Sequence, residues 1–312
     1  MINRRHIRVK VMQSVYAILQ SKSDNLIKEE KFLYSSIDKM YHLYTIILRL
    51  MVEVRDMEKK HIELSRKKRL ATPDELNPNT KFIDNQVFKM LFESVSLNEF
   101  IENNKLNCWY LDEDYVKEIW KLVKSSSFYT DYMKTQNSNF NEDRAFVIGI
   151  FKNIFAPNEK LADYFEGQNI SWVDDIPFVN TWIVKTLNQL KNGQPFILGK
   201  MYKDDDDKKF VVDLFRKTVL NHTSFEKDIE DKTPNWDTER IAEIDMILIK
   251  MAICEFLKFP SIPSRVTINE YIEISKDYST NKSSFFINGV LDKILKEYEA
   301  GKRMNKIGRG LL

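Results

Sequence analysis

The side chains of this chain that could do chemistry gather near its two ends. Arg5, Gln13 and Tyr16 are eight and three positions apart, so on a helix they would lie along one side. A guanidinium binds phosphates, an amide reads base edges and a phenol stacks on a base, which together suit an RNA contact. Arg4 and Arg8 add two cations to the same stretch. A solvated face with a tyrosine at the edge of the core is the commoner structure for such a pattern, and both interpretations stay open here.

The second set lies at the start of a helix predicted near the other end. Lys282, Ser283 and Phe286 bring a cation, a hydroxyl and an aromatic ring to a helix N-terminus, where free backbone N–H groups favour a phosphate. Gly289 lies inside this helix at a cost of about 1 kcal/mol relative to alanine, and we interpret it as permitting close helix packing. The apolar face of the helix repeats at helical spacing and consists of Ile287, Val290, Leu291, Ile294 and Tyr298.

No motif for catalysis or for binding a cofactor or a metal occurs in the sequence. It has no GxxxxGK[ST] or GxGxxG loop, and its four histidines form no HExxH or Cys/His ligand pattern. Cys254 lies in the apolar stretch MAICEF, which favours a packed thiol over a nucleophile. The carboxylates Asp204 to Asp207 are consecutive, so an acidic first helical turn is a better interpretation than a metal site. We therefore expect no enzyme activity, no cofactor and no metal.

Composition and charge favour a helical protein with basic ends. Only 8 Gly and 8 Pro occur among 312 residues, while Lys, Glu, Leu and Ile are common. The net charge of +2 divides into +8 for residues 1–70, −9 for residues 71–259 and +3 for residues 260–312. This distribution indicates a localised surface for a polyanion. Two cysteines without a CxxC pattern, and no segment apolar enough to span a membrane, predict a cytoplasmic location.

Helical periodicity runs through most of the chain. It predicts a first helix over residues 4–20, and helices over residues 26–69 with a break near residues 41–42. It also predicts a helix buried on all sides over residues 237–258, ended by prolines, and then a pair of amphipathic helices over residues 263–298.

An internal repeat is also predicted. Residues 142–183 laid over residues 206–247 give seven identities in 42 positions, without a gap. They include Phe151 with Phe215 and Trp172 with Trp236. We interpret this unbroken register as a degenerate duplication of a helical unit.

The two ends of the chain resemble the NusB family of bacterial transcription antitermination factors. RRHIRVKVMQSVYA (residues 4–17) is similar to the arginine-rich first helix of that family. ERIAEIDMILIKMAICEF (239–256) and IPSRVTINEYIEISKDYSTNKSSFFINGVLDKIL (262–295) resemble its last helices in order and type. Residues 207–232 resemble the helix pair that precedes them. The resemblance covers residues 1–22 and 205–298, which is less than half of the chain.

The resemblance implies an all-α fold of two packed three-helix bundles, without a catalysed reaction. It also implies binding of a boxA-type RNA element in ribosomal RNA leaders, together with a NusE-type small-subunit ribosomal protein. The pair would act on the RNA polymerase elongation complex and suppress premature termination. The residues that it assigns to RNA are Arg4, Arg5 and Arg8 for phosphates, Gln13 and Tyr16 for bases, and Lys282, Ser283 and Phe286 for further contacts.

We therefore expect a discontinuous NusB-like core, residues 1–22 and 205–298, interrupted by a helical insertion, residues 23–204, that continues into the predicted repeat. A flexible basic tail, residues 299–312, would follow. The acidic middle of the chain would suit a basic partner, such as a ribosomal protein or a polymerase surface, or would only brace the core.

Two other functions are compatible with the same residues. The chain could be a NusB-like protein–protein scaffold that has lost RNA binding and works through its insertion. It could also be the RNA-recruiting domain of an RNA-modifying enzyme, but no Gly-rich cofactor loop occurs in the rest of the sequence, which argues against that hypothesis.

Overall fold

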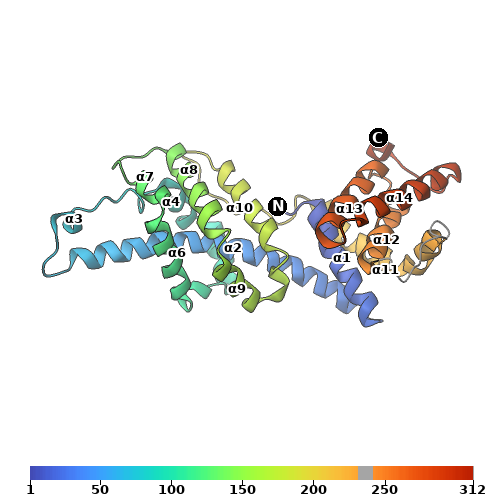
Figure 1. The fold of residues 1–312 in the computed structure, drawn as a ribbon, viewed down its shortest axis with the longest axis horizontal. Helices are drawn as coiled ribbons and strands as arrows, with labels where there is room; N and C mark the ends of the chain where they lie inside the picture. Colours follow the sequence, from blue (N-terminus) through green and yellow to red (C-terminus); the bar gives the residue numbers. More distant parts are fainter. Residues whose placement is uncertain (231–241, 312) are drawn as a thin grey trace. The chain divides into compact units, whose positions relative to one another are not determined.

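The structure is a computed structural model that describes residues 1–230 and 242–311. It is 74% helical, and no β-strand occurs in those two ranges, so the predicted all-α class is confirmed. The chain divides into two compact units (Figure 1). Unit 1 consists of Met1–Ile37 and Lys200–Leu312, and unit 2 of Asp38–Gly199. No helix in the described ranges has the length and apolar character needed to cross a membrane.

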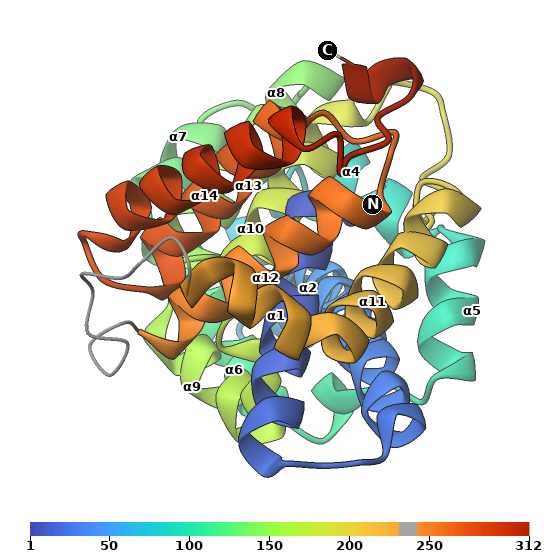
Figure 2. The ribbon, with the colours of Figure 1, turned by 90° about the vertical axis from the view of Figure 1, so that its right-hand side faces the viewer.

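Unit 1 is built around one buried helix, α12 (Glu243–Lys258), as Figure 2 shows. Eleven of its sixteen residues are buried, which confirms the predicted central helix for the part that is described; residues 237–241 lie outside the described residues. The helices that pack on it are α1 (Arg4–Ser21), α11 (Asp205–Glu230), α13 (Ser264–Tyr278) and α14 (Ser283–Ala300).

Helix α1 is more deeply buried than a solvated basic helix would be. Asn3 caps it by accepting a hydrogen bond from the backbone N–H of His6 at 2.8 Å. The predicted apolar stripe is confirmed, since Ile7, Val11 and Val15 are 0% exposed. The helix ends at Lys22, which takes a left-handed conformation with φ 51°.

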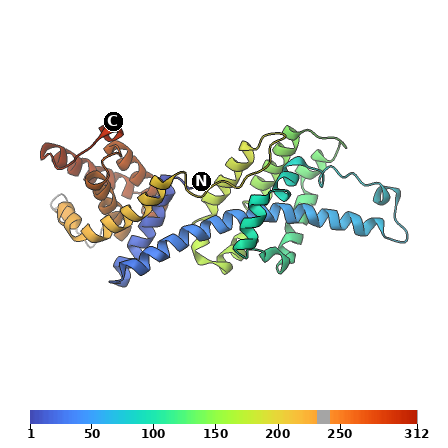
Figure 3. The same cartoon turned by 180° about the vertical axis from the view of Figure 1, so that it is seen from behind.

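Helix α2 (Leu26–Arg66) is continuous over 41 residues, so the break predicted near residues 41–42 is wrong (Figure 3). Leu33, Ile37, Tyr44 and Leu48 follow one another at four, seven and four positions and are all buried, so the apolar stripe continues through the predicted break. The boundary between the two units falls within this helix, after Ile37.

Unit 2 packs shorter helices against the remainder of α2. Within it, the rings of Tyr44 and Trp182 stack with centroids 4.3 Å apart, and the indole N–H of Trp109 donates to the carbonyl of Ile46 at 2.9 Å. The helices of unit 2 are α3 (Pro73–Leu76), α4 (Gln86–Phe92), α5 (Val95–Asn103), α6 (Glu113–Ser125), α7 (Ser127–Tyr132), α8 (Phe140–Ile150), α9 (Glu159–Gln168) and α10 (Ile176–Gln189).

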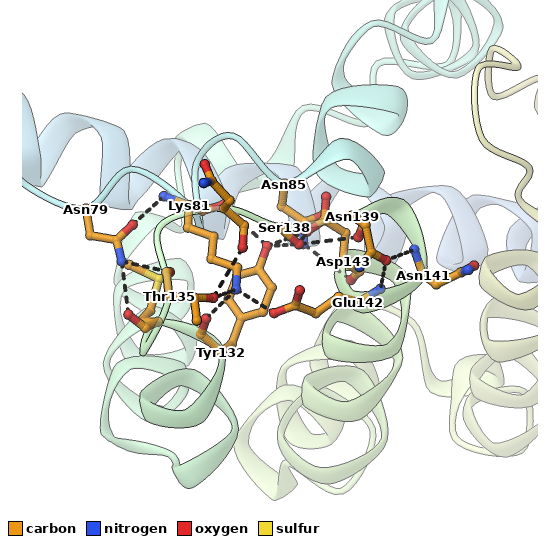
Figure 4. A network of polar contacts seen from close by, with 12 residues as sticks. Asn79, Lys81, Asn85, Tyr132, Thr135, Ser138, Asn139, Asn141, Glu142 and Asp143 are labelled. Atoms are coloured by element: carbon orange, nitrogen blue, oxygen red, sulfur yellow. Dashed lines mark hydrogen bonds and ion pairs between the residues drawn. The ribbon is translucent and has the colours of Figure 1, made fainter.

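A buried polar network joins three segments of unit 2 (Figure 4). The Lys81 ammonium donates to the carbonyl of Tyr132 and the hydroxyl of Thr135, both at 2.7 Å, and forms an ion pair with Glu142. Asp143 is 1% exposed and accepts hydrogen bonds from the Tyr132 hydroxyl at 2.6 Å and from a backbone N–H at 2.8 Å. Because the buried Lys81 is paired with a carboxylate and the buried Asp143 is hydrogen-bonded, the network stabilises the packing of α7 and α8.

The predicted internal repeat is not confirmed. In the first segment α8 continues into a π-helical turn, Phe151–Phe155. This helix ends before Pro157, and α9 begins at Glu159. In the second segment α11 runs unbroken over the equivalent positions. The match at Trp236 lies outside the described residues.

The C-terminal residues, expected to form a flexible tail, are held against unit 1. Arg303 forms an ion pair with Asp228, with 3.1 Å between Nη1 and Oδ1. The Lys306 ammonium donates to three backbone carbonyls, and a short helical turn, Gly308–Leu311, follows. These contacts carry no local sequence signal, because their acceptors lie 44 to 75 residues away along the chain.

Candidate nucleic-acid interface

The start of α1 borders an open groove of about 750 Å³ in unit 1, here called the α1 groove. Its other side is the start of α13, together with the C-terminal turn. The groove is rich in arginine, and the lining residues that matter here are Arg4, Arg5, Arg8, Pro263, Glu270 and Arg309.

Arg4 and Arg5 are accessible, and each is paired with a carboxylate. The Arg4 Nε lies 2.8 Å from Asp207 Oδ1, and the Arg4 guanidinium lies 5.1 Å from the centre of the Phe210 ring. Arg5 binds Glu270 through two parallel hydrogen bonds of 3.0 Å. These hydrogen bonds raise the pKa of Arg5. The Arg5–Glu270 pair is solvent-accessible and contributes only about 0–1 kcal/mol, so a phosphate can compete with Glu270, whereas the Asp207 side chain is only 8% exposed.

Arg8 is not available to a phosphate, which corrects its predicted role. It is 2% exposed and binds the buried Glu255 by hydrogen bonds of 2.6 and 2.9 Å. Glu255 also accepts from the hydroxyls of Thr267 at 2.9 Å and Tyr271 at 2.8 Å. Burial lowers the pKa of Arg8, but the charge and hydrogen bonds of Glu255 outweigh burial and raise it. Arg8 therefore joins α1 to α12 and α13 and positions the residues beside it.

The other two residues predicted on α1 lie where solvent reaches them. Tyr16 is 39% exposed, and Gln13, one turn earlier, is partly exposed. They share one side of the helix, as their spacing predicted. Their contact with bases stays a prediction.

At the start of α14 the structure separates the predicted residues. Lys282 is exposed at the N-cap position and Phe286 is partly exposed, so both stay candidates. Ser283 is 2% exposed, and its hydroxyl accepts from the backbone N–H of Thr280 at 3.2 Å. The predicted RNA contact of Ser283 is therefore wrong, because this side chain closes the turn before α14. Ser283 lies four residues before the core residue Ile287, so the helical spacing already indicated that it faces the core.

Phe285 is a candidate that the sequence analysis passed over. Its ring is 81% exposed, more than that of Phe286. Gly289 follows Phe285 by one helical turn, and a Cβ added there would meet no atom within 4 Å. The prediction that Gly289 permits close helix packing is therefore wrong. Since Phe285 falls on the side of α14 opposite the apolar stripe, the helical periodicity could have revealed it.

Helix α13 joins the two sets of candidates. Glu270, near its middle, holds Arg5, and its last residues lead through a short turn to Lys282. Twelve positions separate these two residues, and the part from Glu270 to the end of α13 at Tyr278 spans about 12 Å along the helix. No group of side chains that could hold a metal ion occurs in the described part of the chain. Unit 1 therefore presents cations and exposed aromatic rings, which suits a single-stranded polyanion with bases.

Comparison with known proteins places these helices in a family. The model of the NusB family matches residues 180–296, which include α11, α12, α13 and most of α14. The transcription antitermination protein NusB of Salinibacter ruber is 43% identical over 110 residues, which cover 35% of this chain and 69% of that protein. The chain belongs to the NusB family.

Other NusB proteins align over similar stretches. The transcription antitermination protein NusB of Chloroherpeton thalassium is 39% identical over 105 residues, or 34% of this chain and 50% of that protein. That of Finegoldia magna is 39% identical over 92 residues, or 28% of this chain and 67% of that protein. The chain thus spans about half to two thirds of these relatives. A search of solved structures gave no significant match.

Proposed function

We propose that this protein is a transcription antitermination factor that binds RNA through unit 1. The relatives that it matches carry the name transcription antitermination protein NusB, and the match covers the helices that bear Glu270, Lys282 and Phe285. The RNA would be a boxA-type element in the leader of a ribosomal RNA operon.

The observation that carries the proposal is the combination of accessible cations with exposed rings in one helical unit. Arg4 and Arg5 keep 42% and 46% of their side chains exposed, although each has a carboxylate partner. Phe285 is 81% exposed and Tyr16 is 39% exposed. Stacking of a base on such a ring contributes about 1–3 kcal/mol, whereas a surface of solvated charges alone would not hold bases.

Binding needs no chemical step. An RNA phosphate would take the place of the Glu270 carboxylate on the guanidinium of Arg5, since both anions fit the same two N–H donors. A neighbouring phosphate would contact Lys282, and unstacked bases would lie on Tyr16 and on Phe285 or Phe286.

The partners that we propose are a NusE-type small-subunit ribosomal protein and the RNA polymerase elongation complex, in the cytoplasm. Together with the ribosomal protein, this chain would hold the RNA on the polymerase and so suppress premature termination. Unit 2 would then be the part of the protein that is added to the NusB-like core.

The test is titration of the full chain with a fluorescent boxA-like RNA oligonucleotide and with a scrambled oligonucleotide of the same length. With three phosphate contacts, the slope of log affinity against log salt would be about −2, so binding weakens about 20-fold between 50 and 200 mM salt. We expect Arg5→Ala and Phe285→Ala each to weaken binding. Matched controls on unit 2 are Lys185→Ala and Tyr110→Ala, since Lys185 is exposed and Tyr110 is 88% exposed.

Two results would contradict RNA binding. One is an affinity for the boxA-like oligonucleotide at low salt no better than background. The other is an equal effect of the unit 1 variants and their controls on unit 2. Either result would favour the second candidate, a NusB-like protein–protein scaffold.

A further inference from the structure

The C-terminal segment, residues 302–311, is fixed to the end of α12 by an unusual anchor. The Lys306 ammonium donates to the carbonyls of Glu255 at 3.2 Å, Phe259 at 3.1 Å and Ile262 at 2.8 Å. The carbonyls of Glu255 and Phe259 also accept from the backbone N–H groups of Phe259 and Ile262, and carbonyls at the end of a helix form the negative end of its dipole. One ammonium has three donors, so this anchor uses all of them.

Glycine makes the second anchor possible. The backbone N–H of Ile307 donates to the carbonyl of Pro260 at 3.1 Å, and Gly310 lies directly against the same carbonyl. A Cβ on Gly310 would overlap that oxygen, so no other residue fits there without moving the backbone. Gly308, between them, has φ +53°, which also favours glycine.

These anchors place Arg309 on the α1 groove. Arg309 lines the groove together with Arg4 and Arg5, and its side chain is exposed. Arg4, Arg5 and Arg8 are each paired with a carboxylate, whereas Arg309 forms no ion pair with any residue in the ranges that the structure describes. A phosphate that enters the groove can therefore bind Arg309 without displacing a carboxylate.

We propose that Arg309 is a further phosphate contact of the RNA site, and that the C-terminal segment is folded in order to deliver it. This inference rests on the proposed function, and it extends the site to residues beyond position 296, where the family match ends. The two anchors explain why the segment is ordered. Because Arg309 has no carboxylate partner among residues 1–230 and 242–311, a phosphate would bind it without the displacement that the paired arginines require.

The test compares two cations of the same segment by titration with the boxA-like oligonucleotide. Arg309→Gln removes the cation that lines the α1 groove. Lys302→Gln is the matched control, because Lys302 is exposed and lines a different groove, beside Arg265 and Tyr298. We expect Arg309→Gln to weaken binding about 3–10-fold and to reduce the salt slope by about 0.7, as the loss of one phosphate contact requires. Lys302→Gln should change affinity less than about twofold.

A third variant tests whether the packing of Gly310 against Pro260 places Arg309 on the α1 groove. Gly310→Ala keeps the charge of Arg309 but pushes the segment away from Pro260, so we expect a loss of affinity close to that of Arg309→Gln. The double variant, Arg309→Gln with Gly310→Ala, should lose no more than either single variant.

The outcomes separate this inference from the proposed function. If the wild-type chain binds and Arg5→Ala weakens it, while Arg309→Gln behaves like Lys302→Gln, only the inference is wrong. A loss in Arg309→Gln without a change in salt slope would also overturn it, since no phosphate contact would have been removed. If the wild-type chain does not bind the oligonucleotide, the proposed function fails and the inference fails with it.

Discussion

Replacing Arg8 by methionine should destabilise unit 1 strongly and leave its RNA contacts nearly intact. The substitution removes two charge-assisted hydrogen bonds, of 2.6 and 2.9 Å, from a carboxylate that is 0% exposed. Glu255 keeps only the two hydroxyl donors of Thr267 and Tyr271. Breaking one partner of a buried ion pair costs about 3–5 kcal/mol, which is a large part of the about 5–15 kcal/mol that holds a domain folded.

The measurement has to report on unit 1 separately, because a chain of two units need not unfold in one step. Hydrogen exchange followed by mass spectrometry does this, with peptides from α12 and α13 as the reporters and peptides from α8 and α10 as the internal reference. A loss of 3–5 kcal/mol would speed exchange in the slowest amides of α12 by about two to three and a half powers of ten.

Two variants control for the cause of this loss. Arg5→Met breaks an ion pair whose side chains are 46% and 21% exposed, and it should cost no more than about 1 kcal/mol. Adding Glu255→Gln to Arg8→Met removes the unpaired charge. The amide oxygen can accept from one of the two hydroxyls and the amide NH2 can donate to the other, so at least about half of the loss should return.

Two results would refute the reasoning. A loss below about 1 kcal/mol in Arg8→Met would mean that the pair is solvated. A folded Arg8→Met protein that loses RNA affinity as strongly as Arg5→Ala would mean that Arg8 does contact phosphate. We expect its affinity to stay within about threefold of the wild type, measured at low temperature where the variant is folded.

Four further predictions concern single residues. Burial lowers the pKa of His42 below 6.5, so the unfolded state takes up the proton first and unit 2 loses stability as the pH falls below 6.5. His42→Gln should flatten this loss in urea unfolding followed by tryptophan fluorescence. Burial raises the pKa of Cys254 to about 12, so iodoacetamide at pH 8 should label this thiol only after denaturation. Lys81→Met removes the cation of the polar network and should destabilise unit 2 by about 2–4 kcal/mol, measured by urea unfolding. Gly289→Ala should stabilise α14 by about 0.5–1 kcal/mol, measured as slower hydrogen exchange of its amides.

Each of these has a contrary result. An equal pH dependence in wild type and His42→Gln would place the titration elsewhere. Rapid labelling of native Cys254 would mean that α12 opens readily. A Lys81→Met protein as stable as the wild type would mean that the network of Figure 4 contributes little. A destabilised Gly289→Ala protein would restore the packing role that the structure does not support.

Periodicity predicted the helices of unit 1 well because a helix buried on one side has to repeat its apolar residues. The first helix was predicted to within one residue, and so was the central helix at its C-terminal end. Periodicity failed at residues 41–42, where it predicted a break although α2 is continuous. The boundary between the two units lies after Ile37, within the same helix, and no proline, glycine or change of spacing marks it. A division between compact units leaves no local signal when a helix runs through it.

Residue type predicted the candidate site only in part, since burial depends on partners that lie far away along the chain. Arg5 and Arg8 look alike in the sequence, yet one pairs with an accessible carboxylate and the other with a buried one, 247 positions away. A signal did exist in Glu255, a single carboxylate in an otherwise apolar stretch of α12. A charge buried there requires a cation, although the sequence does not say which one.

The discontinuity of unit 1 also sets the order in which the chain can fold. The carboxylates that pair with Arg4, Arg8 and Arg5 follow them by 203, 247 and 265 residues. At about 5–20 residues synthesised per second, α1 leaves the ribosome about 10–50 s before its last partner exists. The whole of unit 2 is made during this interval as one uninterrupted stretch of chain. Unit 2 is therefore the first part able to fold, while α1 waits with its arginines unpaired and its apolar stripe uncovered until α13 has been synthesised.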